Sequence, residues 1–183
     1  MDIHWQIDTA GGEELQLRTR PLRQQWEARG PGLLLGIERR ARGLALAEEA
    51  TVTPVLPKRG GGGEVFPATG SVTLEAVLTN PHADLPEIVR LGWLLTQLSV
   101  PADAANRPAW SLGLVPIVLS AAEEVELARC DSATIALAVE AWRLIEGDVP
   151  AQLPEQLLRW WSDFEADTMP LDEGVRSLRA FAE

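Results

Sequence analysis

Alternating hydrophobic and polar residues at the start of the chain predict a β-hairpin. Residues 4–9 alternate between the two faces of an extended strand, and Gly11-Gly12 has the composition of a turn. Residues 15–18 continue the alternation. We therefore expect two short paired strands in this first segment.

A helix is expected to follow the hairpin. It is predicted to begin near Pro21, because proline lacks the N–H group that the first turn of a helix leaves without a partner. Gly30-Pro31-Gly32 is expected to interrupt this helix. A second apolar stretch, residues 33–37, then leads into basic residues 39–42.

Three more segments of the N-terminal half have the composition of strands. Residues 51–56 and 71–78 are rich in β-branched residues, and residues 64–67 have the length of a short edge strand. Pro54 cannot donate a hydrogen bond to a neighbouring strand, so it predicts an edge or a bulge at that point.

The pattern becomes helical from Asp84 onward. Residues 84–98 are apolar almost all round, which predicts a helix through the centre of the core. Asp84 suits the N-cap, and Glu87 three residues later completes a capping-box pattern. A polar loop is expected at 102–110, and further helices over 120–129, 131–145, 153–164 and 171–181.

These elements predict an α+β fold in one domain spanning residues 1–183. Residues 1–80 are β-rich with one helix, and residues 84–183 are helical. Segregated strands and helices favour a small mixed or antiparallel sheet packed against the central helix, followed by a helical C-terminal half.

The composition narrows the function classes. The net charge of −11 repels nucleic-acid phosphates and acidic lipids, so we expect neither a nucleic-acid nor a membrane partner. The single Cys permits no disulfide within the chain, and no basic start with an apolar run marks a signal peptide. A cytoplasmic protein is expected.

The segment Pro86-Glu87-Ile88-Val89-Arg90 has the spacing of the H-E-x-x-H helix of zinc proteases. The chain therefore resembles the zincin-like metallopeptidase fold over roughly Pro21 to Leu98, in the order helix, strands, edge strand, strand and central helix. Glu87 stands at the position of the general base, but Pro86 and Arg90 replace the two ligands and neither can bind zinc. The resemblance implies a metallopeptidase-like fold that has lost its metal ligands.

A second interpretation of this segment needs no family. Glu87 is expected at a helix start for electrostatic reasons alone, and Arg90 at i+3 can pair with it. Trp93 faces away from Ile88 on the same helix, so it must pack on a second layer or be exposed. Trp161, at the margin of the apolar stripe over 153–164, is a candidate interface anchor or a core-edge residue.

The chain has few His and Cys residues that could ligate a metal or serve in other site chemistry. The N and S ligands available to a metal are His4, His82 and Cys130, which are far apart in the chain, so no metal and no cofactor are predicted. Cys130 beside Arg129 is either a thiol of lowered pKa or a small apolar residue. The glycine-rich segment 57–63 lacks the order of a phosphate-binding loop and is expected to be a connection between strands.

We therefore expect a non-catalytic soluble binding domain with a protein or peptide partner. In this hypothesis a cleft beside Glu87 and the strand 71–78 accept an extended segment, and Glu87, Arg90, Trp93 and Trp161 are the candidate binding residues. Two alternatives stay open. One is a hydrolase that uses Glu87 with an unidentified ligand set, and the other is a structural subunit that docks through tryptophan-bearing helices.

Overall fold

The computed structural model describes residues 1–183 except 8–11, 59–61, 79, 102–106 and 179–183. It confirms the α+β class, with a four-stranded mixed sheet in the N-terminal half. The strands lie in the order β1-β2-β4-β3; β1, β2 and β4 are parallel, and β3 is antiparallel to β4. Their bounds are β1 Asp2–Trp5, β2 Glu49–Val55, β3 Gly63–Phe66 and β4 Ser71–Glu75.

The position of Pro54 follows from the lengths of the strands. β2 is an interior strand, but its pairing with β1 ends at Trp5 and Val52. Pro54 lies beyond that end, and its imino nitrogen is on the same side of β2 as Val52 because backbone groups alternate along a strand. At Pro54, β2 is therefore paired with β4 but no longer with β1, so the proline meets no strand on that side, as predicted for an edge.

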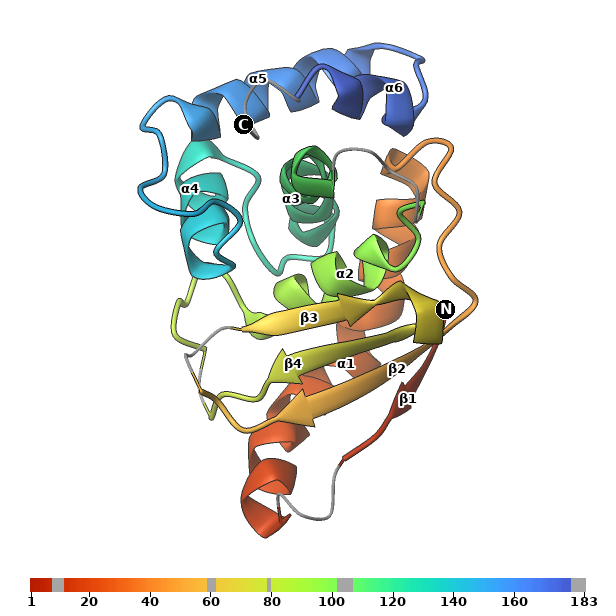
Figure 1. Cartoon of the computed structure of the whole chain (residues 1–183), viewed down its shortest axis with the longest axis vertical. Coiled ribbons are helices and arrows are strands. Elements are labelled where there is room, and N and C mark those ends of the chain that lie inside the picture. The colour runs from red at the N-terminus through yellow and green to blue at the C-terminus, as the bar shows by residue number, and fades with distance from the viewer. Residues whose placement is uncertain (8–11, 59–61, 79, 102–106, 179–183) are drawn as a thin grey trace.

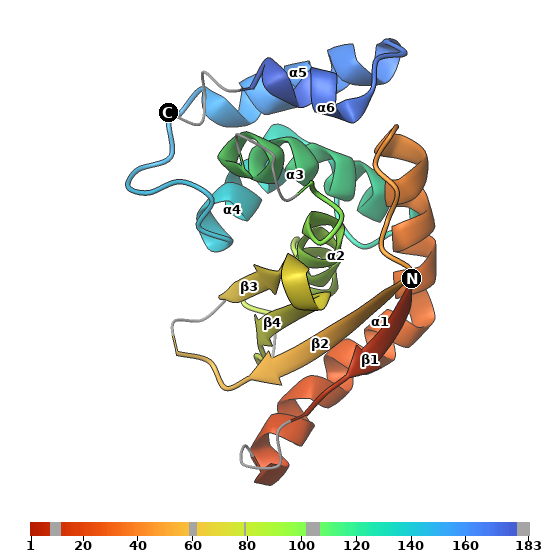
Figure 2. The ribbon, with the colours of Figure 1, turned by 45° about the vertical axis from the view of Figure 1, so that its right-hand side comes forward.

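The sheet has one packed face and one open face. Ala50, Val52, Val72 and Leu74 are buried on the packed face, and residues that alternate with them, such as Thr51, are partly exposed. The packed face lies against α1 (Gly12–Arg40) and α2 (Glu87–Gln97), and no described helix covers the open face (Figures 1 and 2).

Helix α1 corrects three predictions from the sequence. It begins at Gly12 rather than near Pro21. Leu15 and Leu17 belong to this helix, so the second strand of the expected N-terminal hairpin is wrong, and the expected turn lies largely outside the described residues. The predicted interruption at residues 30–32 is also wrong, because α1 continues through both Pro21 and Pro31. Each proline removes one intrahelical hydrogen bond, and the buried face of this long helix offsets that loss.

Helix α2 is the central helix that its apolar sequence predicts. All its residues except Gln97 are buried. It lies between the sheet and α3 (Arg107–Glu124), and α5 (Leu153–Ala166) with α6 (Leu171–Arg176) lies beyond α3 (Figures 1 and 2).

Helix α3 corrects the sequence prediction for residues 107–129. It continues through Pro116 to Glu124, so the helix start expected at Ser120 is wrong, as is the loop expected for 107–110. Its residues are buried on nearly all sides, which favours continuation past a single proline.

The other helices follow the predictions; α4 (Ser132–Ala141) and α6 are shorter than predicted, and α5 extends two residues further, to Ala166. Asp131 caps α4 by accepting hydrogen bonds from the backbone N and Oγ1 of Thr134 at 2.9 Å. α5 spans the predicted segment, and α6 ends at Arg176. β4 also ends early, at Glu75, so residues 76–78 lie outside the sheet.

Candidate functional site

A buried ion pair stands at the start of α2. The Nη2 atom of Arg90 donates to Oε2 of Glu87, and the side chains are 2% and 10% exposed, respectively. The pairing predicted at i, i+3 is therefore present, but in the interior. Breaking such a pair leaves a buried charge without compensation.

The predicted capping box is wrong. Helix α2 begins at Glu87, and its N-cap is Pro86, with φ −62° and ψ 148° and no capping side chain. Asn80 instead accepts a hydrogen bond from the backbone N–H of Glu87 at 3.2 Å. Glu87 uses its carboxylate for Arg90 rather than for the helix end, and position 86 lies outside the helix that carries position 90.

Arg90 also holds two strand ends together. Its Nη1 donates to the carbonyl of Gly62 at 2.9 Å, and its Nη2 donates to the carbonyl of Glu75 at 3.1 Å. The carboxylate of Glu75 accepts hydrogen bonds from the backbone N–H groups of Lys58 at 2.9 Å and Gly62 at 3.0 Å. Glu75 and Arg90 thus fix both ends of the connection between β2 and β3 to the end of β4.

Burial dominates the electrostatics of this cluster. Desolvation raises the pKa of Glu87 above its ordinary value, although the charge and hydrogen bond of Arg90 oppose the rise. Desolvation also lowers the pKa of Arg90, again opposed by Glu87. The two groups stabilise each other's charged form in a site that disfavours either charge alone.

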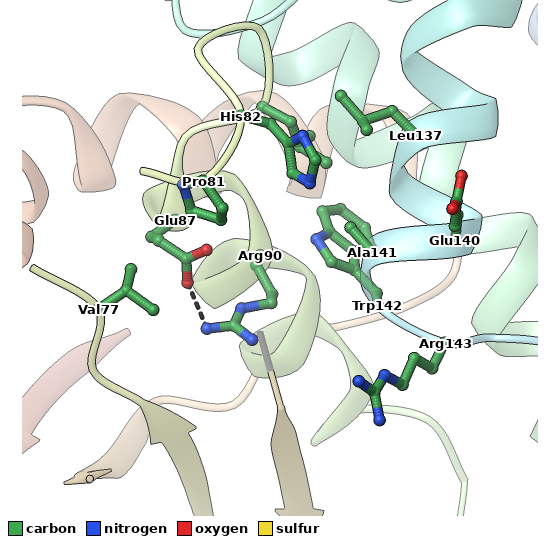
Figure 3. A pocket seen from close by; sticks show the side chains of 11 residues that line it. Val77, Pro81, His82, Glu87, Arg90, Leu137, Glu140, Ala141, Trp142 and Arg143 are labelled. Atoms are coloured by element: carbon green, nitrogen blue, oxygen red, sulfur yellow. Dashed lines mark hydrogen bonds and ion pairs between the residues drawn. The ribbon is translucent and has the colours of Figure 1, made fainter. Parts of the chain in front are cut away.

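A cavity of about 430 Å³, named here the α4 cavity, opens beside the pair. The segment after β4 lines one side with Val77 and His82, and α4 lines the opposite side with Leu137 and Trp142 (Figure 3). Glu87 and Arg90 line it between these walls. The α4 wall could not be predicted from the sequence, because residues 50 or more positions away from Glu87 carry no local signal of their proximity.

Arg143 also lines the α4 cavity and has a backbone conformation that is uncommon for its residue type. Its φ is +54°, in the left-handed region that favours glycine. The backbone N–H of Leu144 donates to the carbonyl of Val139 at 3.0 Å, which closes α4 in a Schellman-type end.

Two neighbouring cavities adjoin the α4 cavity. One, of about 220 Å³, lies toward α1 and is also lined by Val77 and Glu87. The other, of about 740 Å³, is named here the acidic cavity and shares Leu137 with the α4 cavity. Its charged lining residues are Asp84, Glu123, Glu126, Arg129 and Asp131.

Among the described strands, β3 is an outer strand of the sheet and has no strand neighbour on the side away from β4. The backbone N–H of Glu75 donates to the carbonyl of Gly62, so residues 64 and 66 make the ladder hydrogen bonds with β4. The N–H and C=O groups of Gly63 and Val65 therefore point away from β4, toward the outer edge. Gly63, Glu64 and Phe66 are exposed.

The candidate tryptophans are both in the interior. Trp93 is 7% exposed and lies 5.1 Å from the ring of Trp142, and its indole N–H donates to the carbonyl of Ser111 at 3.1 Å. Packing on a second layer is thus confirmed. Trp161 is 5% exposed, so the core-edge alternative holds and the half-exposed position is wrong; its neighbour Trp160 is partly exposed.

The described His and Cys residues do not form a metal site. His4 is exposed on β1, and His82 lines the α4 cavity. Within the described ranges, no group of three or more His, Cys, Asp or Glu residues is placed to hold a metal ion. Burial raises the pKa of Cys130 to about 12, so the lowered pKa considered from the sequence is wrong.

Comparisons of the chain with protein-family models, with curated proteins and with solved structures gave no match. The described part of the chain contains no helix with the length and apolar character needed to cross a membrane.

Proposed function

We propose that this chain is a non-catalytic binding domain that accepts an extended protein or peptide segment along the outer edge of β3. The observation that carries the proposal is the free edge itself. The outward N–H and C=O groups of Gly63 and Val65 lie in an exposed strand, next to the cavity that Arg90 lines. An added strand would satisfy these groups with main-chain hydrogen bonds.

The position of the partner differs from the expectation based on sequence. β4 is paired with β2 on one side and β3 on the other, so it offers no edge to a partner. The antiparallel strand β3 offers that edge instead. Arg90 connects the two features, because it donates to Gly62, immediately before β3, and also lines the α4 cavity.

We also propose that the chain has a zincin-like fold that has lost its metal site. The element order supports this relation, since helix α1 precedes β2, the edge strand β3 precedes β4, and α2 follows. The engagement of Glu87 with Arg90 supports a structural use for that carboxylate. We also propose a cytoplasmic location, which is compatible with a chain that has 1 Cys.

The test blocks the edge of β3 without breaking the sheet. The N–H of Val65 faces outward, so Val65→Pro removes no ladder hydrogen bond with β4 and places a ring against an incoming strand. Val65→Ala is the matched control, because it loses the same side chain but retains the N–H. Wild type and both variants would be panned against a random phage-displayed peptide library of about nine residues, long enough to pass β3 and the cavity.

The expected result is enrichment of peptides on wild type and on Val65→Ala, with loss of these peptides on Val65→Pro. Far-ultraviolet circular dichroism and thermal unfolding of each variant check that the fold is retained. Equal recovery of the enriched peptides on a folded Val65→Pro variant, or no enrichment on wild type, would overturn the proposal.

A further inference from the structure

The α4 cavity and the acidic cavity lie one after the other along helix α4. Glu140 and Ala141 line the first, Ala133 and Thr134 line the second, and Leu137 lines both. Residues 133 to 141 of a helix span about 12 Å, and an extended chain covers that distance in three to four residues. A segment lying along α4 would therefore reach both cavities with residues at this separation.

The α4 cavity favours an apolar side chain and a neutral hydrogen-bond acceptor. Leu85, Leu137 and Trp142 supply apolar walls. Arg90 also lines this cavity with a 2% exposed side chain, and its Nε has no hydrogen-bond partner among the described residues. A buried donor without a partner calls for an acceptor.

The acceptor suited to Arg90 is a main-chain carbonyl rather than a carboxylate. Glu87 already neutralises the guanidinium, and Glu75 adds a second carboxylate close to the pair. A ligand carboxylate would meet these two negative charges. A peptide carbonyl accepts the same hydrogen bond without that repulsion.

The acidic cavity favours basic side chains. Four carboxylates and one guanidinium line it. Asp131 is paired with Arg129 at 3.4 Å and Glu126 lies 3.9 Å from Arg29, whereas the exposed Asp84 and Glu123 form no ion pair with any described residue. The net charge of −11 adds a long-range attraction for a basic partner.

We infer that the segment bound by this protein places an apolar residue in the α4 cavity and, three to four residues away, basic residues in the acidic cavity. The inference rests on the proposed function and specifies the chemistry of the partner. The apolar residue packs against Trp142 and Leu137, its carbonyl accepts from Arg90, and its basic neighbours meet Asp84 and Glu123.

The probe is the peptide acetyl-Gly-Leu-Gly-Gly-Lys-Lys-Gly-amide, titrated into the full chain by isothermal calorimetry. One companion peptide has Ser in place of Leu, and another has Glu in place of both Lys. The protein variant is Asp84→Asn with Glu123→Gln. Its matched control is Glu38→Gln with Asp163→Asn, which changes the net charge equally at exposed residues that line none of these cavities.

The expected result is saturable binding of the probe that weakens with salt, and about tenfold or greater loss of affinity for each companion peptide. The Asp84/Glu123 variant should lose several-fold in affinity, and the Glu38/Asp163 control should retain most of it. Arginine-side-chain NMR should show the Nε–H resonance of Arg90 shift on binding. Equal binding of the Glu-containing peptide, or equal loss in both charge variants, would overturn the inference.

The two proposals fail in different ways. Library peptides that depend on the edge of β3 but lack the apolar and basic pattern would support the proposed function and refute this inference. Binding of the probe that is equal in Val65→Pro and Val65→Ala would refute strand addition and leave the cavity pattern standing. No binding of the probe, alongside edge-dependent library peptides, would also refute this inference.

Discussion

Replacing Arg90 by methionine should destabilise the protein strongly and make its stability depend on pH. The substitution keeps most of the side-chain volume, but it leaves the Glu87 carboxylate buried without its partner and removes the donor to the carbonyls of Gly62 and Glu75. Breaking a buried ion pair from one side typically costs about 3–5 kcal/mol.

Protonation of Glu87 limits that cost. Neutralising a carboxyl group with an ordinary pKa of 4.5 at pH 7 costs about 3.4 kcal/mol, at about 1.36 kcal/mol per pH unit. In Arg90→Met the charge and hydrogen bond that oppose desolvation are gone, so the pKa of Glu87 rises further; the stability that Glu87 contributes is then fully present below its unfolded pKa and is lost as pH rises. The penalty in Arg90→Met should therefore be about 3–4 kcal/mol at pH 7 and about 2–3 kcal/mol smaller at pH 5.

Urea unfolding of wild type and variant at both pH values measures this difference. Arg18→Met is the matched control, since Arg18 pairs with Glu14 at 2.7 Å on the surface of α1, and such pairs contribute about 0–1 kcal/mol. Adding Glu87→Gln to Arg90→Met should remove most of the pH dependence. A penalty for Arg90→Met that is below 1 kcal/mol, or equal at the two pH values, would refute the reasoning.

Three further predictions concern other parts of the fold. Asp131→Ala should lower stability by about 1 kcal/mol, because Asp131 caps α4. The hydrogen bonds from Thr134 lower the pKa of Asp131, so this loss should disappear in urea titrations as pH falls through that lowered value; an equal loss at all pH values would contradict the capping role. Cys130 should react with a thiol reagent at pH 8 roughly a thousandfold more slowly in the folded protein than after unfolding, since its pKa is raised from 9.0 to about 12, and comparable rates would show an open thiol. Gly30→Ala should lower the melting temperature despite the better helix propensity of alanine, because the new Cβ would lie 2.5 Å from the ring of Trp26. Gly32→Ala, with its Cβ 3.2 Å from Val125, should cost less, and the reverse order would contradict the packing of α1.

Strands β2 and β4 and the central helix could be predicted because their signals are local, whereas the second strand of the expected N-terminal hairpin belongs to α1. β-branched runs marked β2 and β4, and the apolar segment at 84–98 marked α2. The continuations of α1 through Pro31 and of α3 through Pro116 could not be predicted, because burial against distant elements decides them.

The candidate site shows the same division. The pairing of Glu87 with Arg90 follows from helical spacing, and the structure has it. The depth of the pair, the capping by Asn80 and the wall formed by Trp142 depend on contacts between separate elements, and neighbouring residues give no signal of them. Helical periodicity places Trp161 at the margin of the apolar stripe, so it leaves open whether the ring is an interface anchor or a core-edge residue; tertiary contacts, including the ring of Phe164, bury it.

The most direct test of the central claim is the hydrogen exchange of single backbone amides in β3, measured by NMR with and without a library-selected peptide. Strand addition predicts that the outward N–H of Val65 becomes strongly protected on binding, while the N–H of Glu64, already bonded to β4, changes little. A saturated complex in which Val65 exchanges as fast as in the free protein would contradict binding along this edge.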